Sequence, residues 1–264
     1  MIAEKLKKAN DRINSEESRV KVINRDMLKY MALILMGIGH MMAFIGIKHF
    51  TNIPRPLFIV LFYGQFFAPP VFFFFISEGF VHTRSRKKYA IRLAIIAVIT
   101  QIPYYLCEFK GEPIWNILTN WSVLASLFAG LMVLIVWETK WRPGVRILIM
   151  LAITAVTVLL QFEWMGFAQV AIFSMYMLRK KPVERFLVFF GIMLIHQYVS
   201  SGFYLGFNIQ SVRYLFAEMA AMIVITFFYN GRKGRFPTFS KWIFYVFYPL
   251  HLLAAYIIKL IIGA

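Results

Sequence analysis

The sequence predicts an all-α protein, a polytopic transmembrane bundle of about nine helices with its N-terminus in the cytoplasm. Composition is the first reason, because the 264 residues are 60% hydrophobic and 18% aromatic, well above the apolar share of soluble domains. The second is that apolar runs of 15 to 24 residues recur along the chain, and about 20 helical residues cross a bilayer core of roughly 30 Å. The third is that basic residues cluster in the short stretches between these runs.

Nine apolar segments are expected to form the spans. They are residues 27–47, 57–80, 89–106, 117–137, 145–162, 164–178, 183–200, 212–229 and 242–262. Only Glu163 clearly separates the fifth segment from the sixth, so these two are expected to form a tight or re-entrant hairpin. Pro69 and Pro70 lie in the middle of the second segment, where two missing N–H groups are expected to break or kink the helix. Residues 1–26 are dense in charge and are expected to be a cytoplasmic tail or an interfacial helix preceding the transmembrane domain, residues 27–264.

Lys and Arg orient the segments, because cytoplasmic loops of membrane proteins carry the excess of these residues. With the N-terminus inside, 24 of the 29 basic residues fall on the cytoplasmic side. The five on the outer side are Lys48, Arg55, Lys110, Arg213 and Lys259. A formal net charge of +17 in a soluble domain would favour nucleic-acid binding, but here the charge is divided among short loops, so no nucleic-acid partner is expected.

Four titratable side chains fall inside the predicted spans. Counting about 1.5 Å per residue places His40, His196 and His251 near the middle of the membrane and Glu218 in its outer half. Ionisable groups are costly there and usually face a cavity, so the four are expected to converge in one polar chamber. The alternatives are that His196 and His251 are hydrogen-bonded packing residues and that Glu218 pairs with Arg213. No metal is expected, because single histidines without paired spacing do not form a recognisable ligand set.

Lys29 and His40 lie on one face of the first predicted helix, because eleven residues at 100° make three turns plus about 20°. Their separation is about 16 Å along the axis. Such a pair can hold the two ends of a long ligand, with an anionic group at Lys29 and the reactive end at His40. In the alternative, Lys29 only extends to the lipid headgroups.

Residues 77–89, SEGFVHTRSRKKY, bring a carboxylate, a histidine, hydroxyl groups and four basic side chains to the cytoplasmic end of the second span. Phosphate groups are well matched by such a loop. Anchoring of the span by positive charge explains the run of basic residues equally well, but it does not explain Glu78 and His82. The segment is therefore predicted to contribute to a functional site.

Four stretches resemble the TraX family of membrane acetyltransferases. They are LKYMALILMGIGH at 28–40, FFFFISEGFVHTRSRKKYAIRLAIIAVITQIP at 72–103, WNILTNWSVLASLFAGLMVL at 115–134 and KWIFYVFYPLHLLAAYII at 241–258. The spacing of Lys29 and His40 is also similar to the Arg-x10-His pattern of acyltransferase family 3. In the TraX pattern an Asp precedes this histidine and Gly-Arg stands where this chain has Gly64-Gln65. Here Gly39 precedes His40, so the chain departs from the pattern at two positions.

The resemblance implies an enzyme of the bacterial cytoplasmic membrane that moves an acetyl group from cytoplasmic acetyl-CoA to an acceptor amine or hydroxyl of a peptide, glycan or lipid. His40 would be the general base. Further catalytic candidates are Glu78, His82 and His251. Residues expected to hold the phosphates of acetyl-CoA are Lys29, Arg84, Arg86, Lys88 and Arg92. One alternative is a transporter or channel for an anionic or proton-coupled solute, with the histidines as a proton relay. A purely structural role in a secretion complex is another.

Overall fold

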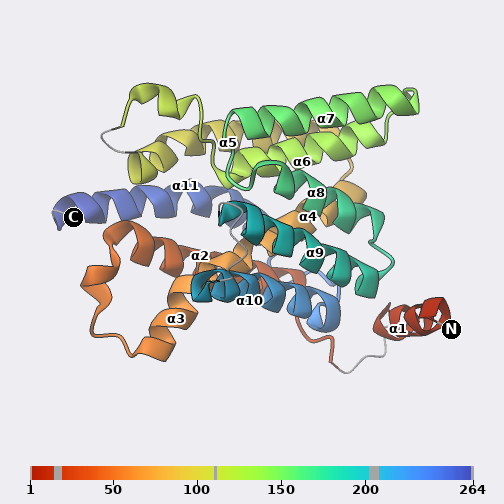
Figure 1. Cartoon of the computed structure of the whole chain (residues 1–264), viewed down its shortest axis with the longest axis horizontal. Helices are drawn as coiled ribbons and strands as arrows, with labels where there is room; N and C mark the ends of the chain where they lie inside the picture. Colours follow the sequence, from red (N-terminus) through yellow and green to blue (C-terminus); the bar gives the residue numbers. More distant parts are fainter. Residues whose placement is uncertain (1, 15–19, 110–111, 202–207, 263–264) are drawn as a thin grey trace.

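The computed structural model describes residues 2–14, 20–109, 112–201 and 208–262 (Figure 1). Within these ranges the regular structure is helical, and an isolated parallel bridge pairs Ile23 with Tyr229. The α-helices are α1 (Ile2–Asn14), α2 (Arg25–Ile45), α3 (Arg55–Tyr63), α4 (Ala68–His82), α5 (Arg86–Glu108), α6 (Val123–Trp137), α7 (Pro143–Leu159), α8 (Met165–Met177), α9 (Pro182–Ser200), α10 (Ile209–Ile223) and α11 (Pro237–Ile261). Short 3-10 helices are η1 (Ile47–Phe50), η2 (Gly64–Phe67) and η3 (Ile114–Ile117), and the π-helix η4 (Val224–Phe228) continues α10. The predicted all-α bundle is confirmed.

Six helical segments in the described ranges are long and apolar enough to cross a bilayer. They are Arg25–Ile45, Arg55–His82, Arg86–Glu108, Pro182–Ser200, Ile209–Phe228 and Thr238–Ile261. Helices α6, α7 and α8 are apolar but shorter, with 15, 17 and 13 residues, against the roughly 20 that a full crossing requires. The chain is thus a multi-pass membrane protein, as predicted. Each of the nine predicted segments coincides with a helix or a broken helix, whereas nine complete crossings and a cytoplasmic N-terminus stay predictions.

The predicted break in the second span is present, but it lies before the two prolines. Helix α3 ends at Tyr63, and the 3-10 turn η2 leads into α4 at Ala68. Pro69 and Pro70 occupy the first turn of α4, where a missing N–H leaves no intrahelical bond unmade. The break brings η2 against α2, beside the predicted base His40.

Basic connections gather at one end of the molecule, called the basic end below. Figure 1 places the N-terminus and the α6–α7 and α8–α9 connections at the right, and the α2–α3 connection and the C-terminus at the left. Arg19 and Lys110, which entered the charge count, lie outside the described residues. Helix α1 is fixed at the basic end by Asn10, whose side-chain oxygen accepts from the Val183 N–H at 3.0 Å and whose amide donates to Glu184 at 2.6 Å. The predicted tail thus includes a helix packed on the start of α9.

Cysteine labelling tests which end is cytoplasmic. In a Cys107→Ala background, Thr51→Cys and Lys140→Cys each place one thiol at an exposed position, at opposite ends of the bundle. We expect a membrane-impermeant maleimide to label Thr51→Cys in intact cells and Lys140→Cys only after permeabilisation, because positive loops face the cytoplasm. The opposite labelling order would contradict the predicted orientation.

Candidate functional site

Two cavities lie between the same four helices, α2, α4, α5 and α11. The first, called the basic cavity, has a volume of about 210 Å³ and lies toward the basic end. Its charged and titratable lining residues are Arg25, Lys29, Glu78, His82, Tyr89, Arg92, Lys241 and Tyr245. The second, called the histidine cavity, has a volume of about 180 Å³. Its titratable lining residues are His40, Tyr104, Glu108, Glu163 and Tyr248. One cavity is therefore rich in cations, and the other holds carboxyl groups and a histidine.

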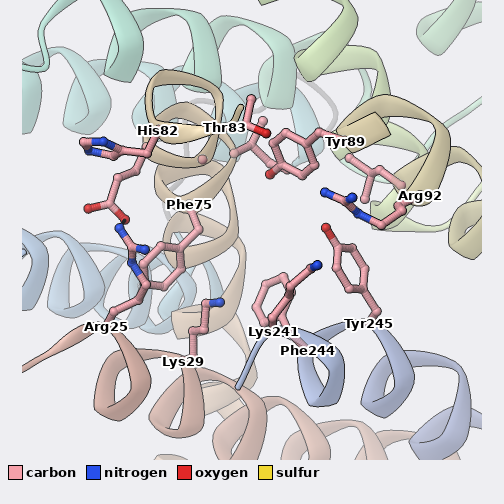
Figure 2. A pocket seen from close by; sticks show the side chains of 14 residues that line it. Arg25, Lys29, Phe75, His82, Thr83, Tyr89, Arg92, Lys241, Phe244 and Tyr245 are labelled. Carbon is pink, nitrogen blue, oxygen red and sulfur yellow. Dashed lines mark ion pairs between the residues drawn. The ribbon is translucent and has the colours of Figure 1, made fainter. Parts of the chain in front are cut away.

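The basic cavity holds more positive than negative charge (Figure 2). Glu78 is committed to a structural pair, because one carboxylate oxygen lies 3.1 Å from Arg25 Nη2 and the other accepts from the Tyr229 hydroxyl at 2.7 Å. In the part of the chain that the structure describes, no carboxylate lies within ion-pair distance of Lys29, Arg92 or Lys241. The cavity thus suits an anionic ligand with several charges.

Aromatic rings position two of these cations. Lys29 Nζ lies 5.3 Å from the centre of the Phe75 ring and 5.2 Å from that of Phe244, which is cation–π distance. The Arg92 side chain is hydrogen-bonded to the Tyr245 hydroxyl, while its Nε is buried without a partner. Figure 2 shows the ends of Arg92 and Tyr245 directed toward each other across the cavity. Arg92 therefore has a donor left for a ligand.

Only part of the predicted phosphate-binding set lines the basic cavity. Lys29 and Arg92 line the basic cavity, whereas Arg84, Arg86 and Lys88 do not. These three belong to the α4–α5 connection and the start of α5, where residues close in sequence point in different directions. Arg86 stacks on Phe80 at 4.2 Å and lies 3.9 Å from Glu138. All three lie outside this cavity, and their predicted role in holding phosphates stays a prediction.

Two lining cations were missed by the sequence reasoning, Arg25 and Lys241. Arg25 precedes Lys29 by four residues and shares its helix face, a signal that was available. Lys241 reaches the cavity from α11, and no feature of the local sequence indicates that α11 packs beside α2. The predicted candidates Glu78 and His82 also line this cavity, so they lie apart from His40.

In the histidine cavity a hydrogen-bond chain fixes the protonation of His40. His251 Nδ1 lies 3.0 Å from the Phe247 carbonyl, and a carbonyl only accepts, so Nδ1 carries the proton. Neutral His251 then has an accepting Nε2, which lies 2.8 Å from His40 Nδ1. His40 must donate through Nδ1, and in neutral His40 the Nε2 atom keeps a free lone pair. This is the state that a general base requires.

Two of the four intramembrane groups expected to converge do so, and two do not. His40 and His251 meet, with rings 5.1 Å apart and nearly parallel. His196 instead stacks on the outside of Trp164, with ring centres 4.5 Å apart, and does not line the cavity. Glu218 is fully buried and accepts from the Gln197 amide at 3.2 Å, rather than pairing with Arg213. A single chamber of four groups was therefore a wrong prediction.

Glu163 is a site residue that the sequence reasoning used only as a separator of two helices. It lies in the turn between α7 and α8, outside the six spanning segments, and its Oε2 accepts from the Val123 N–H at 2.8 Å. Burial, together with the nearby charge of Glu108, raises the pKa of the Glu163 carboxyl to about 7, although hydrogen bonds from Val123 and Tyr248 act in the opposite direction. At neutral pH this carboxyl therefore exchanges between its charged and neutral forms.

One row of side chains on each of three helices runs from the basic cavity to the histidine cavity. On α5 the row is Leu93, Ala97, Thr100 and Tyr104, and on α2 it is Lys29, Leu33, Met36 and His40, with successive spacings of three or four residues. On α11 it is Lys241, Tyr245, Tyr248 and Leu252. Such spacing keeps each row on one helix face. The predicted common face of Lys29 and His40 is thus the wall of both cavities.

The two departures from the TraX pattern are in contact. A Cβ atom built on Gly39 would lie 2.6 Å from Gln65 Cβ and 3.0 Å from the Phe62 carbonyl oxygen. Gln65 lines the histidine cavity and donates to that carbonyl at 2.8 Å. The backbone of α2 and the turn η2 therefore approach each other closely beside His40, and Gly39 permits this approach.

The chain is similar to a known protein family and to a named bacterial protein. The family model described as TraX protein matches residues 24–259, a range that contains both cavities. A probable fimbrial assembly protein FimC, serogroup H1, from Dichelobacter nodosus is 27% identical over 201 residues, which cover 69% of this chain and 76% of that protein. No solved structure matches.

Replacing Gly39 by alanine tests the close approach of α2 and η2. We expect Gly39→Ala to lower the free energy of unfolding by about 1–3 kcal/mol, because the new methyl group overlaps Gln65 and a backbone oxygen. Gly191→Ala is the matched control, since no atom lies within 4 Å of its Cβ position. Thermal unfolding in detergent measures both, and equal midpoints for the two variants would contradict the packing described.

Proposed function

The chain belongs to the TraX protein family, and on this premise we propose that it is a membrane acyltransferase that moves an acetyl group from cytoplasmic acetyl-CoA to an acceptor. The observation that carries the proposal is the pairing of two unlike cavities along the same helices. Unpaired cations at one end suit a phosphate-bearing donor, and His40 at the other end has a free lone pair for proton removal.

Lys29, Arg92 and Lys241 are the proposed phosphate ligands. Arg25 supports them as a fourth positive charge, held in place by Glu78. From this position the long arm of coenzyme A would extend between the three rows toward His40, about 16 Å from Lys29 along α2. The Thr100 hydroxyl lies in the row between the cavities, buried and without a partner. It offers one polar contact to an amide of that arm.

The proposed chemistry uses His40 Nε2 as a general base. It takes a proton from the acceptor nitrogen or oxygen as that atom attacks the thioester carbon. The C–S bond then breaks, and the same proton passes to the thiolate sulfur of the coenzyme. His251 is a positioning residue, because its hydrogen bond holds His40 in the tautomer that can accept.

The acceptor is proposed to be a peptide amine, with glycan and lipid groups as alternatives. The Dichelobacter relative is described as a probable fimbrial assembly protein. That description favours a fimbrial or pilus subunit as the protein that carries the acceptor.

A proton-coupled transporter is the second candidate function. It is favoured by a histidine pair deep in the bundle, one member of which, His40, lines a cavity. The cation-rich cavity, by contrast, is better explained by a donor with several phosphates. Thermal stabilisation of the purified protein by acetyl-CoA would favour the enzyme, whereas solute flux without such stabilisation would favour the transporter.

Removal of the base tests the proposed reaction directly. With labelled acetyl-CoA and a peptide acceptor, we expect His40→Ala to lower kcat by about 10²–10⁴-fold, the usual contribution of general-base catalysis. His49→Ala, at an exposed histidine outside both cavities, is the matched control. A His40→Ala protein that folds and transfers acetyl groups at the wild-type rate would exclude the assigned role.

Substitutions in the basic cavity test donor binding. We expect Arg92→Ala and Lys241→Ala each to raise the KM for acetyl-CoA about 10-fold or more, because each removes a charge-assisted contact to phosphate. Lys88→Ala is the control, since Lys88 is exposed and lies outside the cavity. Equal KM values for all three variants would place the donor elsewhere.

A further inference from the structure

We propose that Glu163 supplies the negative charge that stabilises His40 while His40 carries the transferred proton. The inference rests on the proposed function and adds a residue to it. Glu163 acts through His40, so it is a positioning residue whose contribution is electrostatic.

Location is the first observation. Glu163 and His40 line the same cavity of about 180 Å³, reaching it from the α7–α8 turn and from α2 respectively. Among the residues that the structure describes, no Lys or Arg lines this cavity. The charge of an imidazolium formed inside the bundle is screened less than in bulk water, so a carboxylate across the cavity stabilises it.

The second observation is that Glu163 is held from several sides. Its carboxylate accepts from the Val123 N–H at 2.8 Å and from the Tyr248 hydroxyl. Its own N–H donates to the Trp121 carbonyl at 2.7 Å, and its carbonyl accepts from the Ser126 hydroxyl. Tyr248 also packs edge-on against the rings of both His40 and His251. The carboxylate is therefore fixed relative to the histidine pair.

The third observation is the backbone around Glu163. Gln161, Trp164 and Met165 have positive φ angles of 49°, 67° and 35°. Such angles are unfavourable for residues with side chains, and the surrounding structure must enforce them. A short connection between two apolar helices does not require three of them. Together they place Glu163 toward the cavity and Trp164 as part of its wall.

Other titratable groups near Glu163 do not replace it. Glu108 and Tyr104 reach the cavity from α5, Tyr248 reaches it from α11, and His196 lies behind Trp164. Glu108 ends its helix within range of the positive charge of Lys259, so part of its charge is compensated. Glu163 has hydrogen-bond donors as partners, and no ion pair joins it to a cation within the described ranges.

The role of Glu163 leaves the balance of the reaction unchanged. His40 Nε2 gains the proton of the acceptor as the new bond to the acetyl carbon forms, and it returns this proton to the sulfur as the C–S bond breaks. Glu163 stays ionised throughout and exchanges no proton. Because the Glu163 pKa is about 7, its charge is present above that pH and is lost below it.

Glu163→Gln in the full-length protein tests the inference, because glutamine keeps an oxygen for the Val123 N–H and removes the charge. We expect kcat to fall about 10-fold or more with little change in the KM for acetyl-CoA. Wild-type kcat should rise as the pH increases through about 7, and this rise should be absent from the variant. Glu112→Gln, at an exposed carboxyl outside both cavities, is the control and should keep the rise.

The outcomes separate the inference from the proposed function. If Glu163→Gln retains the wild-type kcat and pH profile while His40→Ala is inactive, the role of Glu163 is overturned and the proposed function stands. Absence of acetyl transfer by the wild-type protein overturns both. A thermal midpoint for Glu163→Gln near that of the wild type distinguishes loss of charge from loss of fold.

Discussion

The hydrogen bond between His40 and His251 is the interaction on which the arrangement of the site depends. Inside a membrane a polar side chain must find its partner within the protein, because no water can replace it. His40 on α2 and His251 on α11 satisfy each other at 2.8 Å, and the Phe247 carbonyl completes the chain. This contact fixes the two helices side by side and determines which nitrogen of His40 is free. The packing of α2 beside α11 and the tautomer of His40 therefore both follow from the need of these two histidines for a hydrogen-bond partner.

Charge is separated along the helix rows that run from this pair. The basic cavity holds the unpaired cations Lys29, Arg92 and Lys241, and the histidine cavity holds Glu108 and Glu163. An anionic donor of the proposed kind would be attracted to the first cavity and repelled from the second. A long ligand with phosphates at one end and a neutral group at the other would thus be oriented before it reaches His40. The same field would disfavour entry of the phosphates into the second cavity.

Sequence patterns predicted the features that depend on residues close together in the chain. Apolar period and charge alternation placed the helices, two adjacent prolines located the break before α4, and helical geometry put Lys29 and His40 on one face. Contacts between distant helices were not predictable in this way. Arg84, Arg86 and Lys88 do not line the basic cavity, because residues close together in sequence can point in different directions.

Glu163 and Lys241 escaped prediction for a different physical reason. Glu163 follows an apolar segment in a turn, where a charged residue is ordinary, and only the fold returns that turn into the bundle against α6. Lys241 precedes a span on its basic side, where the positive-inside rule already explains a lysine. In both cases a general rule accounted for the residue, and only contacts with residues far away in sequence place it at a cavity.

Gly39 stands at one of the two positions where this chain departs from the TraX pattern. The TraX pattern has Asp at this position and Arg at position 65, whereas this chain has glycine and Gln65, and the two positions are in contact. Because both charged residues are absent together, neither position holds a buried charge without a partner. A single unpaired charge there would be costly. The same change removes the carboxylate adjacent to His40. Glu163, which reaches the histidine cavity from the α7–α8 turn, places a carboxyl group in the same cavity as His40 from a different part of the chain.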